Sequence, residues 1–151
     1  MQNIIEKIKE LKKAKNAVIL AHCYQNIEID LVADYVGDSL GLSRLAAKCD
    51  ADIILFAGVY FMAQTAKILS PEKKVLLPDL RSGCAMADMI DEAQIVEFKG
   101  KYPGMPVVCY VNSTAEVKEK EGAKLDTDVS VEGLKSLIAP YKALIEKETG
   151  K

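Results

Sequence analysis

The sequence contains no tryptophan, a single histidine and no long uninterrupted run of apolar residues. A membrane-spanning helix needs about 20 consecutive apolar residues, and a signal peptide needs an apolar core of about 7–15 residues. The N-terminal stretch is instead charged and amphipathic. We therefore expect a cytoplasmic protein that does not bind a membrane.

The chain also lacks an excess of charge of either sign. It carries 20 lysines and arginines against 22 aspartates and glutamates, for a formal net charge of -2. This balance provides no basic surface for nucleic acid, so an anionic ligand has to be held by local contacts. With 50% hydrophobic and 28% charged residues in 151 positions, the composition is typical of one globular domain.

No pair of cysteines has the C-x-x-C spacing of a local metal motif. The four cysteines are far apart, and without a secretory signal they are not expected to form a disulfide framework. Free thiols and metal ligands therefore remain as the two interpretations. The four are Cys23, Cys49, Cys84 and Cys109.

Hydrophobic periodicity predicts alternating strands and helices. Apolar runs rich in β-branched residues predict strands at 17–21, 52–57, 74–77 and 107–111. Apolar residues at helical spacing predict helices at 1–15, 30–49, 60–69 and 86–99. This alternation predicts an α/β fold with a four-stranded parallel sheet, helices on both faces, and strand order 2-1-3-4 when these strands are numbered along the chain.

The composition changes after residue 118. Residues 119–128 are charged and nearly free of apolar side chains, which predicts a linker between a first domain at 1–118 and a last segment at 129–151. That last segment has the pattern of an amphipathic helix interrupted by Pro140. We expect it to pack back on the first domain.

Ligands of parallel α/β sheets bind beyond the carboxyl ends of the strands. His22 and Tyr24 follow the first predicted strand, where an imidazole and a phenol suit proton transfer to a small oxygen-rich substrate. A structural histidine at a strand end is an equal alternative. Tyr110 and Asn112 are predicted to share one face of the last strand and to bind a carboxylate or keto oxygen. Asp38-Ser39 fits a helix interruption, because Asp and Ser are common where a helix bends.

Cys84 lies in a glycine-containing turn, RSGCAMAD, that is predicted to open a helix. Backbone N–H groups at such a position favour a thiolate, which suits a nucleophile or a metal ligand equally. The alternative of a buried, inert cysteine fits Cys49 and Cys109 better, because they lie at a helix end and inside a predicted strand.

Together these motifs resemble quinolinate synthase, in order and in spacing, over about residues 1–118. The matching segments are HCYQ at 22–25, VGDSL at 36–40, GVYFMA at 58–63, TAKILSPEK at 65–73, LLPD at 76–79, GCAMA at 83–87 and VCYVNSTAEVK at 108–118.

The resemblance implies an enzyme of NAD and pyridine nucleotide biosynthesis, a transferase that condenses iminoaspartate with dihydroxyacetone phosphate to give quinolinate. The family has three αβα domains, each of which contributes one cysteine to a 4Fe-4S cluster whose open iron acts as a Lewis acid. By motif, Cys84 matches a cluster ligand, and His22 and Tyr24 match catalytic positions. Ser39, Tyr110 and Asn112 match substrate-binding positions.

The chain departs from the family pattern at several places. Cys23, Tyr60 and Gln64 replace residues that are more usual there. The resemblance stops after Lys118, so the later domains, which carry the other two cluster ligands, are missing. We expect a truncated or internally deleted form, monomeric or homo-oligomeric, whose last helix matches the end of the family. The alternative is a non-catalytic α/β domain that binds a small anionic ligand, or an inactive folding unit.

Overall fold

The computed structural model describes residues 2–121. Its helices and strands follow in the order α1 (Gln2–Ala14), β1 (Ala17–His22), α2 (Ile27–Asp30), β2 (Tyr35–Gly37), α3 (Ser39–Lys48), β3 (Ile53–Ala57), α4 (Tyr60–Leu69), β4 (Lys74–Leu76), the 3-10 helix η1 (Ala87–Met89), α5 (Glu92–Lys101) and α6 (Ala115–Glu121). Within residues 2–121, no helix is long and apolar enough to cross a membrane.

The chain divides into two compact units. The first contains Met1–Met89 and Val111–Ala115, and the second contains Ile90–Tyr110 and the described residues from Glu116 onward. All four strands belong to the first unit. The fold is therefore established by the first half of the chain.

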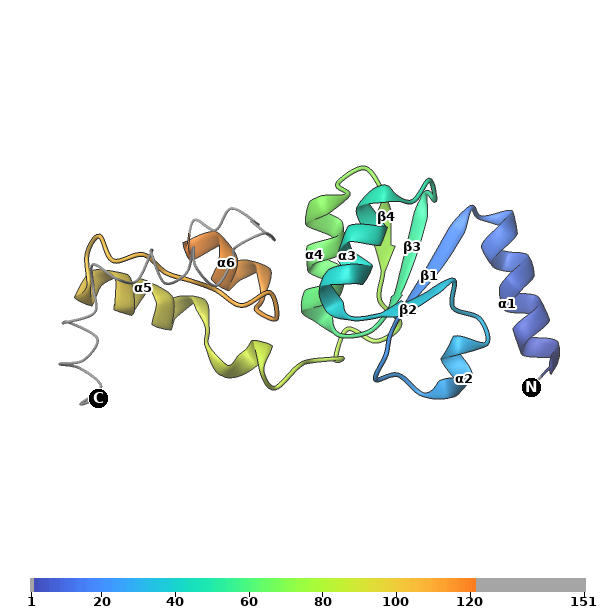
Figure 1. The fold of residues 1–151 in the computed structure, drawn as a ribbon, viewed down its shortest axis with the longest axis horizontal. Helices are drawn as coiled ribbons and strands as arrows, with labels where there is room; N and C mark the ends of the chain where they lie inside the picture. Colours follow the sequence, from blue (N-terminus) through green and yellow to red (C-terminus); the bar gives the residue numbers. More distant parts are fainter. Residues whose placement is uncertain (1, 122–151) are drawn as a thin grey trace. The chain divides into compact units, whose positions relative to one another are not determined.

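The sheet has the order β2-β1-β3-β4, and every neighbouring pair is parallel. The central strand β1 pairs with β3 over five residues, from Ala17 opposite Ile53 to Ala21 opposite Ala57. Four consecutive residues of β1 are buried because helices cover both of its faces. In Figure 1, α3 and α4 lie on one side of the sheet and α1 lies on the other.

The two faces of the sheet have separate cores. Even-numbered residues of β1 and β3, such as Leu20 and Phe56, pack with α3 and α4 in the larger cluster. Odd-numbered residues, such as Ile19 and Ala57, pack with Val32 and with residues of α1 in the smaller one. This alternation follows from the two-residue period of a strand.

The expected four-stranded parallel sheet with helices on both faces is confirmed, but two of its elements were predicted wrongly. The helix expected at 30–49 is interrupted by Tyr35–Gly37, which forms the edge strand β2. Residues 107–111 form no strand in the structure. The order 2-1-3-4 therefore applies to a different set of strands. The segment at 74–77 was expected next to the first strand, but in the structure β1 lies between β2 and β3, and 74–76 forms the edge strand β4.

Other predicted elements agree closely with the structure. The helix expected at 60–69 is α4 with the same bounds, and the strands at 17–21, 52–57 and 74–77 are β1, β3 and β4 within one residue at each end. The helix expected at 86–99 begins later, at Glu92. Residues 119–121 of the expected linker belong to α6, and the remainder of that segment and the expected last helix lie outside the described residues.

Candidate active site

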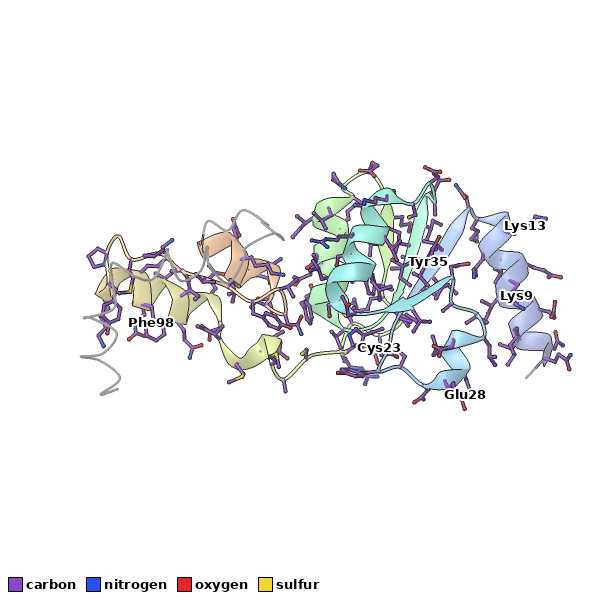
Figure 2. All side chains as sticks on the ribbon, viewed as in Figure 1. Lys9, Lys13, Cys23, Glu28, Tyr35 and Phe98 are labelled. Carbon is purple, nitrogen blue, oxygen red and sulfur yellow. The ribbon has the colours of Figure 1, made fainter. Side chains whose placement is uncertain are left out.

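The loops that follow the strands are joined by backbone hydrogen bonds at one edge of the sheet. Because the strands are parallel, their carboxyl ends meet at this edge. The amide of Cys23, after β1, donates to the carbonyl of Gly37, at the end of β2, over 2.9 Å. The amide of Tyr60, after β3, donates to the carbonyl of Ser82, after β4, over 2.7 Å. Figure 2 labels Cys23 where β1 ends.

His22 is the last residue of β1, and its ring is oriented by the turn that follows. Its Nδ1 accepts a hydrogen bond from the backbone N–H of Tyr24 over 3.2 Å. An Nδ1 that accepts a hydrogen bond assigns the proton of the neutral imidazole to Nε2. The ring of Tyr24 meets the His22 ring edge to face, with centroids 4.8 Å apart, and is 89% exposed. His22 therefore presents an Nε2–H donor beside an accessible phenol.

Ser39 occupies the first turn of α3, directly after β2. The helix begins there because the side chain of Asp38 accepts a hydrogen bond from the amide of Gly41 over 2.8 Å, which satisfies one of the unpaired N–H groups of the first turn. Ser39 is buried. The Asp-Ser pair is thus a helix start, which corrects the expectation of one continuous helix through this position.

Cys84 lies in the loop after β4 and is half-buried against the larger core cluster. Its carbonyl accepts a hydrogen bond from the amide of Asp88 over 2.9 Å. A Cβ atom at Gly83 would lie 3.0 Å from a carboxylate oxygen of Asp88, so the turn requires glycine or a shift of that side chain. Only the three-residue η1 follows closely, so the expected α-helix does not begin at Cys84, and the argument from a helix dipole fails.

The same loop carries an ion pair that the sequence analysis did not select. The guanidinium of Arg81 contacts both carboxylate oxygens of Asp79, at 3.0 and 2.8 Å. The hydrogen bonds from the side chain and backbone of Arg81 lower the pKa of Asp79, and the carboxylate raises the pKa of Arg81. Both side chains are exposed to solvent, so the pair shapes the loop more than it stabilises the fold.

Asn112 and Tyr110, which were predicted to act together, fall in different units. Asn112 belongs to the first unit, and its side-chain oxygen is buried without a hydrogen-bond partner among the described residues. Tyr110 belongs to the second unit and is 64% exposed. Since no strand forms here, the argument that the two side chains share a strand face does not apply.

Two free thiols lie at the carboxyl edge of the sheet, Cys23 after β1 and Cys84 after β4. Of these, Cys84 lies in the segment that matches a cluster ligand of the family. Residues 2–121 contain no group of three or more histidine, cysteine or acidic residues able to hold a metal. A cubane iron-sulfur cluster is held by several cysteines. This part of the chain therefore does not fit a complete cluster by itself.

Comparison with known proteins identifies the family. The sequence model described as "Quinolinate synthetase A protein" matches residues 6–137. The chain belongs to the quinolinate synthase family. A quinolinate synthase from Alkaliphilus metalliredigens is 58% identical over 135 residues, covering 89% of this chain and 45% of the relative. A quinolinate synthase from Dehalococcoides mccartyi is 65% identical over 115 residues, which cover 76% of this chain and 38% of the relative.

The chain spans about half the length, or less, of these quinolinate synthases. A relative from Pyrococcus abyssi is 52% identical over 161 residues, which cover 99% of this chain and 53% of the relative. The similarity thus continues beyond Lys118, where it was expected to stop. An alignment of this length has room for a short insertion but not for two missing domains, so the comparison argues against an internal deletion.

Proposed function

We propose that this chain provides a substrate-binding and catalytic portion of a quinolinate synthase. In the reaction, iminoaspartate condenses with dihydroxyacetone phosphate, with loss of phosphate and water, to give quinolinate for NAD biosynthesis. The observation that carries the proposal is that His22 ends β1, Ser39 follows β2 and Cys84 follows β4 at the same sheet edge, in a chain of this family.

We assign roles by the hydrogen-bonding chemistry of each side chain. The Nε2–H of His22 donates to a substrate oxygen, with the proton placed there by the turn at Tyr24. The exposed phenol of Tyr24 exchanges protons with the same substrate. The side-chain oxygen of Asn112 accepts from an N–H or O–H of the ligand, because an acceptor buried without a partner is costly until it is paired. By the family motif, we also assign Ser39 and Tyr110 as substrate-binding residues.

We assign Cys84 as one ligand of a 4Fe-4S cluster, which when bound supplies a Lewis acid. At least one further ligand must come from outside the described residues, because these contain no group of three or more side chains able to hold a metal. We also propose that the protein acts in the cytoplasm on small molecules and not on nucleic acid, in line with its balanced charge.

The second candidate function is binding of a small anionic ligand without turnover. It is favoured by the absence, within residues 2–121, of a group of three or more side chains able to hold a metal.

Reconstitution with iron and sulfide under anaerobic conditions tests the cluster assignment. About four irons per assembled site, lost in Cys84→Ser and kept in Cys109→Ser, support cluster binding. Absence of protein-bound iron in all three proteins supports the second candidate.

Binding of a four-carbon dicarboxylate tests the substrate assignment separately. We expect malate, a stable stand-in for iminoaspartate, to bind the full chain in calorimetry. His22→Ala and Asn112→Ala should weaken it about tenfold, the effect of one lost hydrogen bond to a charged ligand. Cys109→Ser serves as the control, and equal affinity in all variants contradicts the assigned roles.

A further inference from the structure

Gln64 connects two segments that are far apart in the sequence. It lies in the second turn of α4, and its side-chain oxygen accepts a hydrogen bond from the backbone N–H of Ala115 over 3.0 Å, across 51 residues. Both residues belong to the first unit. Gln64 thus attaches Val111–Ala115 to the helix that begins at the carboxyl end of β3.

Ala115 is the first residue of α6, and the amides of a first helical turn have no partner within the helix. The carboxamide of Gln64 supplies the acceptor, as a capping side chain does, but from a different helix. The attachment point is three residues beyond Asn112 and two beyond the buried Ser113. It therefore restricts the backbone that carries the unpaired oxygen of Asn112.

We propose that Gln64 is a positioning residue for Asn112 and fixes the place at which the Asn112 oxygen accepts a hydrogen bond from the substrate. This inference rests on the proposed substrate-binding role of Asn112. Gln64 itself is not assigned a contact with the ligand. The contact to Ala115 is made by the acceptor oxygen of Gln64, so glutamate should keep this contact and leucine should lose it.

Amide hydrogen exchange, followed by NMR on the full chain, tests the attachment independently of any ligand. In Gln64→Leu, the Ala115 amide should exchange about tenfold faster, as expected for one lost hydrogen bond, while the amide of Phe56 in β3 should keep its protection. Gln64→Glu should restore slow exchange at Ala115. An unchanged Ala115 rate in Gln64→Leu would overturn the proposal.

A double-mutant cycle then tests whether the attachment acts through Asn112. Malate affinity is measured for the wild type, Gln64→Leu, Asn112→Ala and the double variant. We expect Gln64→Leu to weaken binding about fivefold in the wild type and to have no further effect when Asn112 is already alanine. Gln64→Glu should bind malate as the wild type does.

The outcomes separate the two proposals. If Gln64→Leu weakens binding equally with and without Asn112, Gln64 does not act through Asn112, and the positioning role is refuted. If Asn112→Ala leaves affinity unchanged, the substrate role proposed for Asn112 fails, and with it the function of the attachment. The exchange rate of Ala115 still shows in that case whether Gln64 holds the segment.

Discussion

The two faces of the sheet differ in how completely they are covered. On the α3 and α4 face, the side chains of Leu20, Ile54 and Phe56 are fully buried. On the α1 face, an apolar groove of about 290 Å³ remains, lined by residues that include Ile19, Leu55 and Leu76. The helices of the well-packed face also carry Ser39 and the start of α4, so these parts of the candidate site border the more completely buried core.

The strongest test of this difference compares neighbouring residues of β3. Phe56 faces the α3 and α4 core and is fully buried, whereas Leu55 faces the groove and is half-buried. Phe56→Ala should lower the free energy of unfolding by about 3–5 kcal/mol because it leaves a cavity. Leu55→Ala should lower it by about 1–2 kcal/mol, since less of its surface is buried. Urea unfolding measures both, and equal losses would show that the faces are equivalent.

A second test removes a polar contact at the opposite edge of the same face. The ammonium of Lys73 donates to the carbonyl of Ala46, over 2.9 Å, and to that of Cys49, where α3 ends. Lys73→Met leaves these helix-end carbonyls without that donor and should cost about 1–3 kcal/mol in urea unfolding. Lys74→Met, at the exposed neighbouring position, is the matched control and should stay within about 0.5 kcal/mol of the wild type. A larger loss of unfolding free energy in Lys74→Met than in Lys73→Met would contradict the role of the Lys73 hydrogen bonds.

A third test crowds the turn that carries Cys84. Gly83→Ala places a methyl group against the carboxylate of Asp88 and should cost about 1 kcal/mol of unfolding free energy. It should also change the rate at which a thiol reagent modifies Cys84. In an Asp88→Ala background the same substitution should cost much less, since the crowding atom is gone. An equal cost in both backgrounds would mean that the close approach is not the cause.

The smallest expected effect concerns the exposed pair in the same loop. Arg81 lowers the pKa of Asp79, so the contribution of the pair is present above the ordinary pKa of an aspartate and is lost as the pH falls through the lowered pKa. Arg81→Gln should raise the pKa of Asp79 toward its ordinary value, as measured by NMR titration of the carboxyl carbon. Solvent screening keeps the change in stability small. A pKa unchanged by the substitution would remove Arg81 as the cause.

The helices and strands that were predicted well are those whose own residue pattern is enough to give their type and their bounds. The ten residues of α4 show a helical period and end before Ser70-Pro71, so both bounds could be predicted. The strand β2 has only three residues, and their apolar side chains fit a helical stripe equally well. Residues 107–111 have the composition of a strand, but a strand forms only where a neighbour supplies hydrogen-bond partners. No composition reveals whether that neighbour is present.

The residues of the candidate site divide in the same way, into those that a local sequence pattern predicts and those that depend on distant parts of the chain. His22 and Cys84 could be placed at one edge from the sequence, because parallel strands bring their carboxyl ends together. Ser39 could not be placed by this argument, because it follows β2, a strand that the sequence pattern did not predict. The contact between Gln64 and Ala115 joins residues 51 positions apart and left no local pattern in the sequence. The assignment of Tyr110 to a common strand face failed because it depended on a strand that does not form.

The position of the strands along the chain also sets an order of assembly during synthesis. All four strands lie between Ala17 and Leu76, so the sheet can close while the remainder is still being translated. Gln64 is then already in place on α4, but its partner Ala115 emerges from the ribosome only later. The scaffold is thus complete before the site is, and a nascent chain stopped between these residues would be folded and still lack Asn112.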